Sequence, residues 1–198
     1  MRVRLFISVV FAFLMLVTLS SSSAGQQNSP PAPAIEHPPL TALPASILDA
    51  ELKSARGRSF RLSDYSEKVL VINLWATWCG PCRFETPALV KLHKQFLFQG
   101  VRIVELSTED PGTSTTQVRR WIRNFAVPYR VGWSNPEVTK TLMQGRDAIP
   151  QTFVVSRSGR IIRRFVGFNA KATPPQVKQA VKEALKETSP PQSLQPSK

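Results

Sequence analysis

A near-continuous apolar run, VLVINLW, occupies residues 69–75 and ends four residues before the first of two cysteines. An apolar segment of this length predicts a central strand buried on both faces, because a strand with one face in water would alternate apolar and polar residues. With 42% hydrophobic and 20% charged residues, the chain has the composition of a globular protein. The fold is therefore expected to form around this strand.

The remaining patterns predict an α/β domain. Further strands are expected at residues 101–107, 152–156 and 160–166, and helices are expected after the cysteines and at 114–126, 135–143 and 173–187. A strand-helix-strand order implies parallel strands with a right-handed crossover, and a tight turn at Ser158-Gly159 implies a late antiparallel pair. The prediction is a small mixed central sheet with helices on both faces.

Two segments before the central strand predict an N-terminal β-hairpin extension. Residues 46–52 and 59–65 flank a polar connection that contains Gly57, which suits a turn. In the helix after the cysteines, an apolar side is expected from Phe84, Leu89, Leu92, Phe96 and Leu97.

The first 24 residues have the pattern of a signal peptide. Arg2 and Arg4 precede an apolar stretch over residues 5–19, and small residues at Ser22 and Ala24 suit cleavage after Ala24. The alternative is an uncleaved anchor, for which residues 5–19 are short, since a membrane span needs roughly 20 residues. We expect an exported protein, periplasmic or extracytoplasmic, tethered if the leader stays uncleaved.

The segments on either side of the predicted domain have little apolar content. Residues 25–44 are polar and proline-rich, and the tail over residues 189–198 is similar. Such sequences cannot bury enough apolar surface to offset the entropy of ordering them. We therefore expect a linker at 25–44, one folded domain at 45–188 and a disordered tail at 189–198.

The chain is strongly basic, with a formal net charge of +13. Such a charge would ordinarily indicate a nucleic-acid partner. Export argues against that partner, and the basic residues are scattered along the sequence, as at 119–120 and 160–164. We expect no nucleic-acid partner, while a weak association with an anionic membrane surface stays open.

The two cysteines, Cys79 and Cys82, lie where a helix should begin after the central strand. A sulfur in the first helical turn meets unpaired backbone N–H groups and the positive end of the helix dipole, which favour the thiolate. The second sulfur lies one turn later on the same face, close enough for a disulfide. The pair therefore predicts thiol–disulfide exchange, with Cys79 as attacking and Cys82 as resolving cysteine.

Other uses of the pair have less support from the sequence. A zinc site lacks a second cysteine pair, and only His37 and His93 could add nitrogen ligands. A structural disulfide across so short a loop would restrain the unfolded chain little. A Cu(I)-binding metallochaperone remains an alternative because thiolates favour that ion, although Met143 is remote in sequence. We expect no metal and no cofactor.

The segment WATWCGPCRFETP, residues 75–87, resembles the active-site segment of thioredoxin-like proteins. The closer resemblance is to exported thiol-disulfide oxidoreductases of the TlpA/ResA type, which include the cytochrome c maturation reductases. It spans about residues 46–187 and includes the stretch GRDAIPQTFVVSRSGRIIRRFVG at 145–167. The resemblance implies a thioredoxin-like fold.

The resemblance also implies roles for individual residues. Cys79 corresponds to an exposed nucleophile and Cys82 to a buried resolving cysteine. Thioredoxin has a buried aspartate six positions before its first cysteine, where this chain has Asn73. In the TlpA/ResA type a glutamate three residues after the second cysteine takes that place, and Glu85 stands there. Glu85 is thus expected to accept the proton of Cys82. Its alternative is a surface glutamate near a helix start.

A substrate-binding surface is implied around the cysteines. The Ile149-Pro150 bond corresponds to the loop whose cis proline faces the disulfide, although an ordinary trans proline is the more frequent arrangement. The expected substrate-binding residues are Trp78, Gly80, Pro81, Ile149 and Pro150.

Taken with the resemblance, these residues predict a reductase of protein disulfides. Gly80 and Pro81 add no charge that would stabilise the reduced form, which favours an electron donor over a strong oxidant. The expected partners are disulfide-bearing protein substrates, as in cytochrome c maturation or copper-site assembly, and a membrane thiol electron donor. A disulfide oxidase or isomerase is the alternative within the same chemistry.

Overall fold

The computed structural model describes residues 41–187. The predicted signal peptide, most of the linker and the tail lie outside these described residues. Within them, none of the helices has the length and apolar character that crossing a membrane requires. The first contacts of the domain involve the end of the predicted linker, since Ala42 bridges to Arg160 and Leu43 is buried.

One mixed sheet of seven strands forms the centre of the domain, in the order β2-β1-β5-β4-β3-β6-β7. Strand β3 is parallel to β4, β4 is parallel to β5, and the other neighbours are antiparallel. The strands are β1 (Leu52–Ser54), β2 (Ser59–Phe60), β3 (Val69–Trp75), β4 (Val101–Ser107), β5 (Arg130–Trp133), β6 (Gln151–Val155) and β7 (Ile161–Val166).

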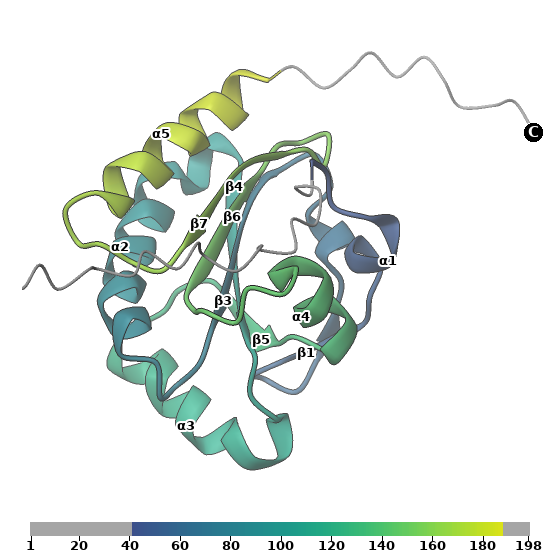
Figure 1. The fold of residues 1–198 in the computed structure, drawn as a ribbon, viewed down its shortest axis with the longest axis vertical. Coiled ribbons are helices and arrows are strands. Elements are labelled where there is room, and N and C mark those ends of the chain that lie inside the picture. Colours follow the sequence, from purple (N-terminus) through teal and green to yellow (C-terminus); the bar gives the residue numbers. More distant parts are fainter. Residues whose placement is uncertain (1–40, 188–198) are drawn as a thin grey trace, which may run out of the picture. The chain divides into compact units, whose positions relative to one another are not determined.

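Helices cover both faces of this sheet, as Figure 1 shows. The helices α2, α3 and α5 lie on one face, and the short helices α1 and α4 lie on the other. Their bounds are α1 (Ala45–Leu48), α2 (Gly80–Phe96), α3 (Pro111–Asn124), α4 (Pro136–Met143) and α5 (Thr173–Lys186), with 3-10 turns η1 (Leu62–Tyr65) and η2 (Leu97–Gln99). The expected α/β class is confirmed.

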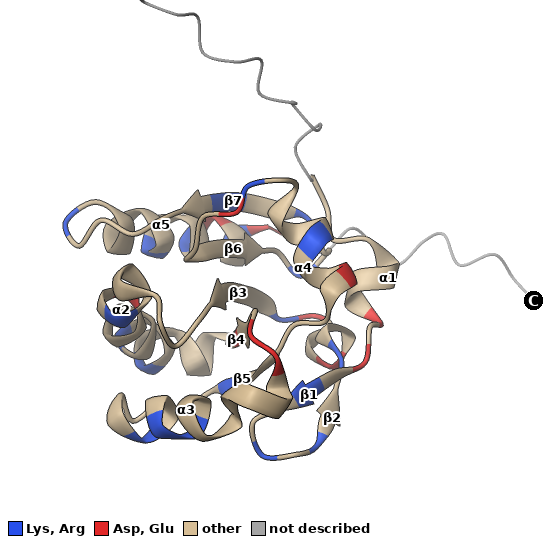
Figure 2. Cartoon of the chain, turned by 60° about the horizontal axis from the view of Figure 1, so that its bottom comes forward, with Lys and Arg blue, Asp and Glu red and all other residues tan. Residues whose placement is uncertain are grey.

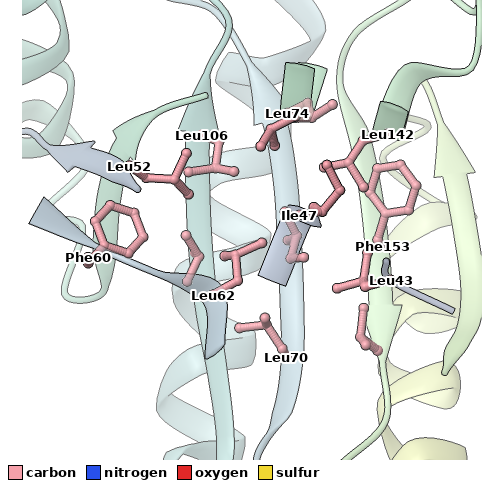
Figure 3. Packing of buried hydrophobic residues seen from close by; sticks show 14 residues of the cluster. Leu43, Ile47, Leu52, Phe60, Leu62, Leu70, Leu74, Leu106, Leu142 and Phe153 are labelled. Carbon is pink, nitrogen blue, oxygen red and sulfur yellow. The ribbon is translucent and has the colours of Figure 1, made fainter. Parts of the chain in front are cut away.

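The central strand β3 is buried along its whole length, as its apolar sequence predicts. Its side chains alternate between two cores. Leu70, Ile72 and Leu74 face α1 and α4, where Ile47 and Leu142 pack against them (Figure 3). On the other face, Val69 and Val71 pack with the apolar sides of α2 and α5.

Three local expectations were wrong in part. The N-terminal hairpin exists as β1 and β2, but Ala45–Leu48 is helical and Leu62–Tyr65 is a 3-10 turn. Helix α3 begins at Pro111, before the predicted start at residue 114, because the side chain of Asp110 caps it by accepting hydrogen bonds from two backbone N–H groups. Phe84 is 71% exposed and does not join the apolar side of α2.

Basic residues lie on several elements of the fold. In Figure 2 the ribbon is blue at such residues on the β1–β2 hairpin, on α2, α3 and α5, and on β7. Two acidic residues, Glu109 and Asp110, directly precede α3. The basic charge is thus distributed rather than gathered in one patch.

Candidate active site

The cysteine pair lies at the start of helix α2, directly after the carboxyl end of the central strand. Cys79 is the N-cap of α2, and Cys82 lies in its first turn. The two sulfur atoms are bonded to each other, with 5.3 Å between the Cα atoms. The backbone N–H of Cys82 also points to Cys79 Sγ at 3.2 Å. This amide has no partner within the helix and faces the sulfur instead. It would therefore stabilise a thiolate at Cys79 once the disulfide is reduced.

Cys79 is less accessible than its expected role as an exposed nucleophile implies. In this disulfide form Cys79 is 4% exposed and Cys82 is 1% exposed. The expectation for Cys79 was wrong because its sulfur is turned inward to Cys82 and is covered by the carbonyl of Ile149, whose oxygen lies 3.7 Å from Sγ. The buried position expected for Cys82 agrees with the structure.

Exposed residues surround the covered disulfide. Trp78, Gly80 and Pro81 are all exposed beside it, and the exposed fraction of Trp78 is 73%. Phe84 presents a second exposed aromatic ring one helical turn after Gly80. Its sequence spacing suggested a core residue, and only the direction of α2 places it at the surface. Trp75, by contrast, is buried against Trp121.

The loop opposite the cysteines ends in a cis peptide bond between Ile149 and Pro150. Pro150 is buried, Ile149 is half-buried, and strand β6 begins at the next residue. The structure therefore brings these two residues to the cysteine pair, across about 70 residues of sequence.

The segment before Cys79 is held in place by Glu109. One carboxylate oxygen accepts a hydrogen bond from the backbone N–H of Thr77 at 2.7 Å, and the other accepts one from the Thr77 hydroxyl at 2.7 Å. Ser107 donates to the same carboxylate at 3.0 Å. The turn that presents Trp78 and Cys79 is thus tied to the end of strand β4.

Glu85 is buried inside the sheet–helix interface, with an exposed fraction of 2%. Asn73 on β3 donates its amide to Oε2 at 2.8 Å, and Thr152 on β6 donates its hydroxyl to Oε1 at 2.7 Å. Burial raises the pKa of Glu85 to about 7, although the hydrogen bonds from Thr152 and Asn73 act in the opposite direction. Its alternative as a surface glutamate is inconsistent with this position.

A second carboxyl group lies close to Glu85, on the neighbouring strand. Glu105 on β4 has no exposed surface and lies beside Asn73 in the sheet register. The hydroxyl of Tyr129 donates to Glu105 Oε1 at 3.2 Å, while Oε2 has no hydrogen-bond partner among residues 41–187. Burial, and then the charge of Glu85, raise the pKa of Glu105 to about 8. The sequence predicts strand 101–107, but it does not indicate that this glutamate is enclosed.

Within residues 41–187 no group of three or more His, Cys, Asp or Glu side chains is arranged to hold a metal ion. The site therefore combines two sulfurs with two buried carboxyl groups.

Comparisons with known proteins identify the family of the chain. The model of the AhpC/TSA family matches residues 44–164. The chain is 31% identical over 121 residues to the thiol-disulfide oxidoreductase ResA of Bacillus subtilis, a match that covers 59% of this chain and 63% of that protein. It is 32% identical over 163 residues to the thiol:disulfide interchange protein DsbE of Haemophilus influenzae, with 82% of each chain covered.

A solved structure shows the same fold. The thioredoxin-family thiol:disulfide interchange protein of Chlorobium tepidum superposes with a TM-score of 0.62 at 24% identity, covering 76% of this chain and 99% of that one. The predicted thioredoxin-like architecture is thus confirmed. The chain belongs to the AhpC/TSA family, among its thioredoxin-like thiol-disulfide oxidoreductases of the ResA and DsbE type.

Proposed function

We propose that this thiol-disulfide oxidoreductase acts outside the cytoplasm as a reductase of disulfides in other proteins. The observation that supports this most directly is the Cys79–Cys82 pair at a helix start, with a buried carboxyl group of raised pKa within one helical turn of the second cysteine. In the reduced protein the two thiols hold two electrons and two protons, which are the quantities needed to reduce one disulfide.

The reaction begins at Cys79. Its thiolate attacks one sulfur of the substrate disulfide, so that a mixed disulfide forms and the other substrate sulfur leaves as a thiolate. The amide of Cys82 and the dipole of α2 lower the energy of the attacking anion. For this step the substrate must displace the Ile149 carbonyl from its position beside Cys79 Sγ, or approach the sulfur from another side.

Cys82 then resolves the mixed disulfide. Its thiol gives a proton to the Glu85 carboxylate, and the new thiolate attacks Cys79 Sγ, so that the Cys79–Cys82 bond forms and the substrate leaves reduced. A carboxyl group with a pKa of about 7 is suited to this exchange because it can both accept and release a proton near neutral pH. Asn73 and Thr152 hold both oxygens of Glu85 in a fixed orientation.

The substrate is expected to bind as an extended segment along the exposed residues beside the disulfide. Trp78, Gly80 and Pro81 offer one exposed wall, and the Ile149-Pro150 loop offers the other. An extended chain beside Ile149 can pair with its backbone as an added strand.

The direction of electron flow separates the proposal from its alternative, an oxidase or isomerase. The two residues between the cysteines, Gly80 and Pro81, are uncharged and give the reduced form no added stabilisation. The reduction potential should therefore lie nearer the about −270 mV of reducing catalysts than the about −120 mV of strong oxidants. A membrane thiol carrier would supply the electrons, and cytochrome c maturation or copper-site assembly would use them.

Trapping the substrate tests the function itself. A Cys82→Ala variant retains the attacking sulfur but cannot resolve, so it should accumulate as a mixed disulfide through Cys79 with its natural substrate, identifiable by mass spectrometry. The matched Cys79→Ala/Cys82→Ala variant should trap nothing. If the single variant yields no adduct in the native extracytoplasmic compartment, the proposed reductase role is wrong.

The base role of Glu85 gives a second prediction. Glu85→Gln keeps the shape of the side chain but cannot accept a proton, so the rate of disulfide reduction at neutral pH should fall about a hundredfold. The rate of the wild-type protein should rise through pH 7, where the Glu85 carboxyl ionises, and this rise should disappear in the variant. Stopped-flow measurement of the single-turnover rate of reduction over a range from about pH 5.5 to about pH 8 resolves both effects. A variant with the wild-type rate at every pH would remove Glu85 from the mechanism.

A further inference from the structure

Glu105 is a buried acidic residue for which the reaction described above has no use. It is fully enclosed in the middle of strand β4, where a carboxyl group is costly to place unless it has a partner for each oxygen. Only Oε1 has such partners, because Tyr129 donates to it and Oε2 has none in the described structure. A carboxylate with one unpaired buried oxygen is unfavourable, whereas a protonated carboxyl group carries no charge.

Two contacts connect Glu105 to the cysteine pair. The hydroxyl of Thr86 donates to the backbone carbonyl of Cys82 at 3.0 Å and lies 3.5 Å from Glu105 Oε1. The second contact is through the sheet, since Glu105 lies beside Asn73 in the strand register and Asn73 donates to Glu85. Glu105 is thus one side chain away from both Cys82 and its proposed base.

The titratable groups around Glu105 come from two sides. Glu85 on α2 opposes ionisation of Glu105 because the two charges would repel. Tyr129 precedes β5 and, because burial raises its pKa well above the usual range, keeps its proton as a hydrogen-bond donor. Behind Tyr129, His93 packs against the phenol ring, and burial and Arg102 lower its pKa, so the histidine adds no charge at neutral pH.

We propose that Glu105 is a further positioning residue of the redox centre. Glu85 and Glu105 form a buried pair of carboxyl groups, and because Glu105 stays neutral, the single negative charge of this pair lies on Glu85. The inference rests on the proposed base role of Glu85. While Glu105 is neutral, Glu85 can take the Cys82 proton, and the new thiolate then meets two uncharged carboxyl groups. Once Glu105 ionises, its charge opposes the negative sulfur that must form on Cys82, and resolution slows.

This arrangement predicts a bell-shaped pH profile for disulfide reduction. The rate rises as Glu85 ionises and falls as Glu105 loses its proton at higher pH. Glu105→Gln cannot ionise, and its side chain can still accept from Tyr129. At pH 9 it should reduce a small disulfide-bonded protein about tenfold faster than the wild type, because about nine tenths of Glu105 is ionised one pH unit above its pKa.

Three further variants separate the outcomes. Tyr129→Phe removes the donor that favours the ionised form of Glu105, so the falling limb should move to higher pH. In a Glu85→Gln background the falling limb should move to lower pH, because the charge of Glu85 no longer opposes the ionisation of Glu105. Glu137→Gln neutralises an exposed glutamate on α4 and should keep both limbs.

The measurement is the single-turnover rate at which the prereduced protein reduces the disulfides of insulin, over a range from about pH 6 to about pH 9.5. A falling limb that persists unchanged in Glu105→Gln and Tyr129→Phe overturns the role of Glu105 and leaves that of Glu85 intact. If Glu85→Gln keeps the rising limb, the base role fails instead. If the falling limb keeps its position in the Glu85→Gln background, the proposed coupling between the charges of Glu85 and Glu105 is wrong.

Discussion

Replacing Cys79 by serine is expected to lower the rate of disulfide reduction by at least about a thousandfold, because a hydroxyl at a helix start is not ionised near neutral pH and cannot exchange with a disulfide. The loss should appear in the first turnover as well as at steady state. The measurement is reduction of insulin with a dithiol as the electron source, corrected for the uncatalysed reaction.

Two comparisons give this result its meaning. Cys82→Ser should retain a rapid first attack and then stop at the mixed disulfide, because Cys79 is intact. The control is Thr116→Ser, a substitution by serine on the exposed side of α3, which should reduce insulin at the wild-type rate. Equal first-turnover rates in Cys79→Ser and Cys82→Ser would contradict the assignment of Cys79 as the attacking sulfur.

The second large effect is expected in the stability of the oxidised protein. The pKa of Glu105 is about 8 in the folded state, against 4.5 for an ordinary glutamate. A raised pKa in the folded state means that stability is highest at acid pH and is lost as the pH rises from about 4.5 to about 8, where only the unfolded chain ionises freely. Glu105→Gln removes this loss.

The expected result is a change in the stabilising effect of Glu105→Gln with pH. The increase in the free energy of unfolding that Glu105→Gln causes should be about 4 kcal/mol larger at pH 9 than at pH 5. The figure follows from 1.36 kcal/mol for each pH unit between 5 and the pKa of Glu105. Urea unfolding at the two pH values measures the difference, and Glu137→Gln is the control. An identical effect at both pH values would mean that Glu105 is already ionised in the folded protein.

Much of the architecture could be predicted from the sequence because its strongest signals are local. The apolar run of β3, the helix start at the cysteines and the Ser158-Gly159 turn each determine an element by themselves. Strand β5 gave no such signal, since RVGW is short and contains a glycine. Gly132 is needed there because a Cβ atom would lie 2.5 Å from the carbonyl of Lys53 on β1, a contact between segments that are about 80 residues apart.

The site was predictable only in part, for a related reason. Cys79, Cys82 and Glu85 share one helix, so their spacing places them together. The enclosure of Glu85 depends on Asn73 and Thr152, which come from two other strands. Glu105 resembles the polar residue of a half-exposed strand, and its burial follows from a helix layer that local spacing does not place. The covering of Cys79 by Ile149 likewise depends on a distant loop.

The edge of the sheet at β7 has a consequence for how the protein behaves at high concentration. Strand β7 is an edge strand of the sheet, and its beginning is covered because Ala42 bridges to Arg160. Farther along the strand, Arg163 lies beside Glu183 at 3.7 Å, and both side chains are partly exposed. Because charged side chains and a covered end disfavour pairing with an identical edge strand, this border of the sheet is expected to resist aggregation through strand pairing.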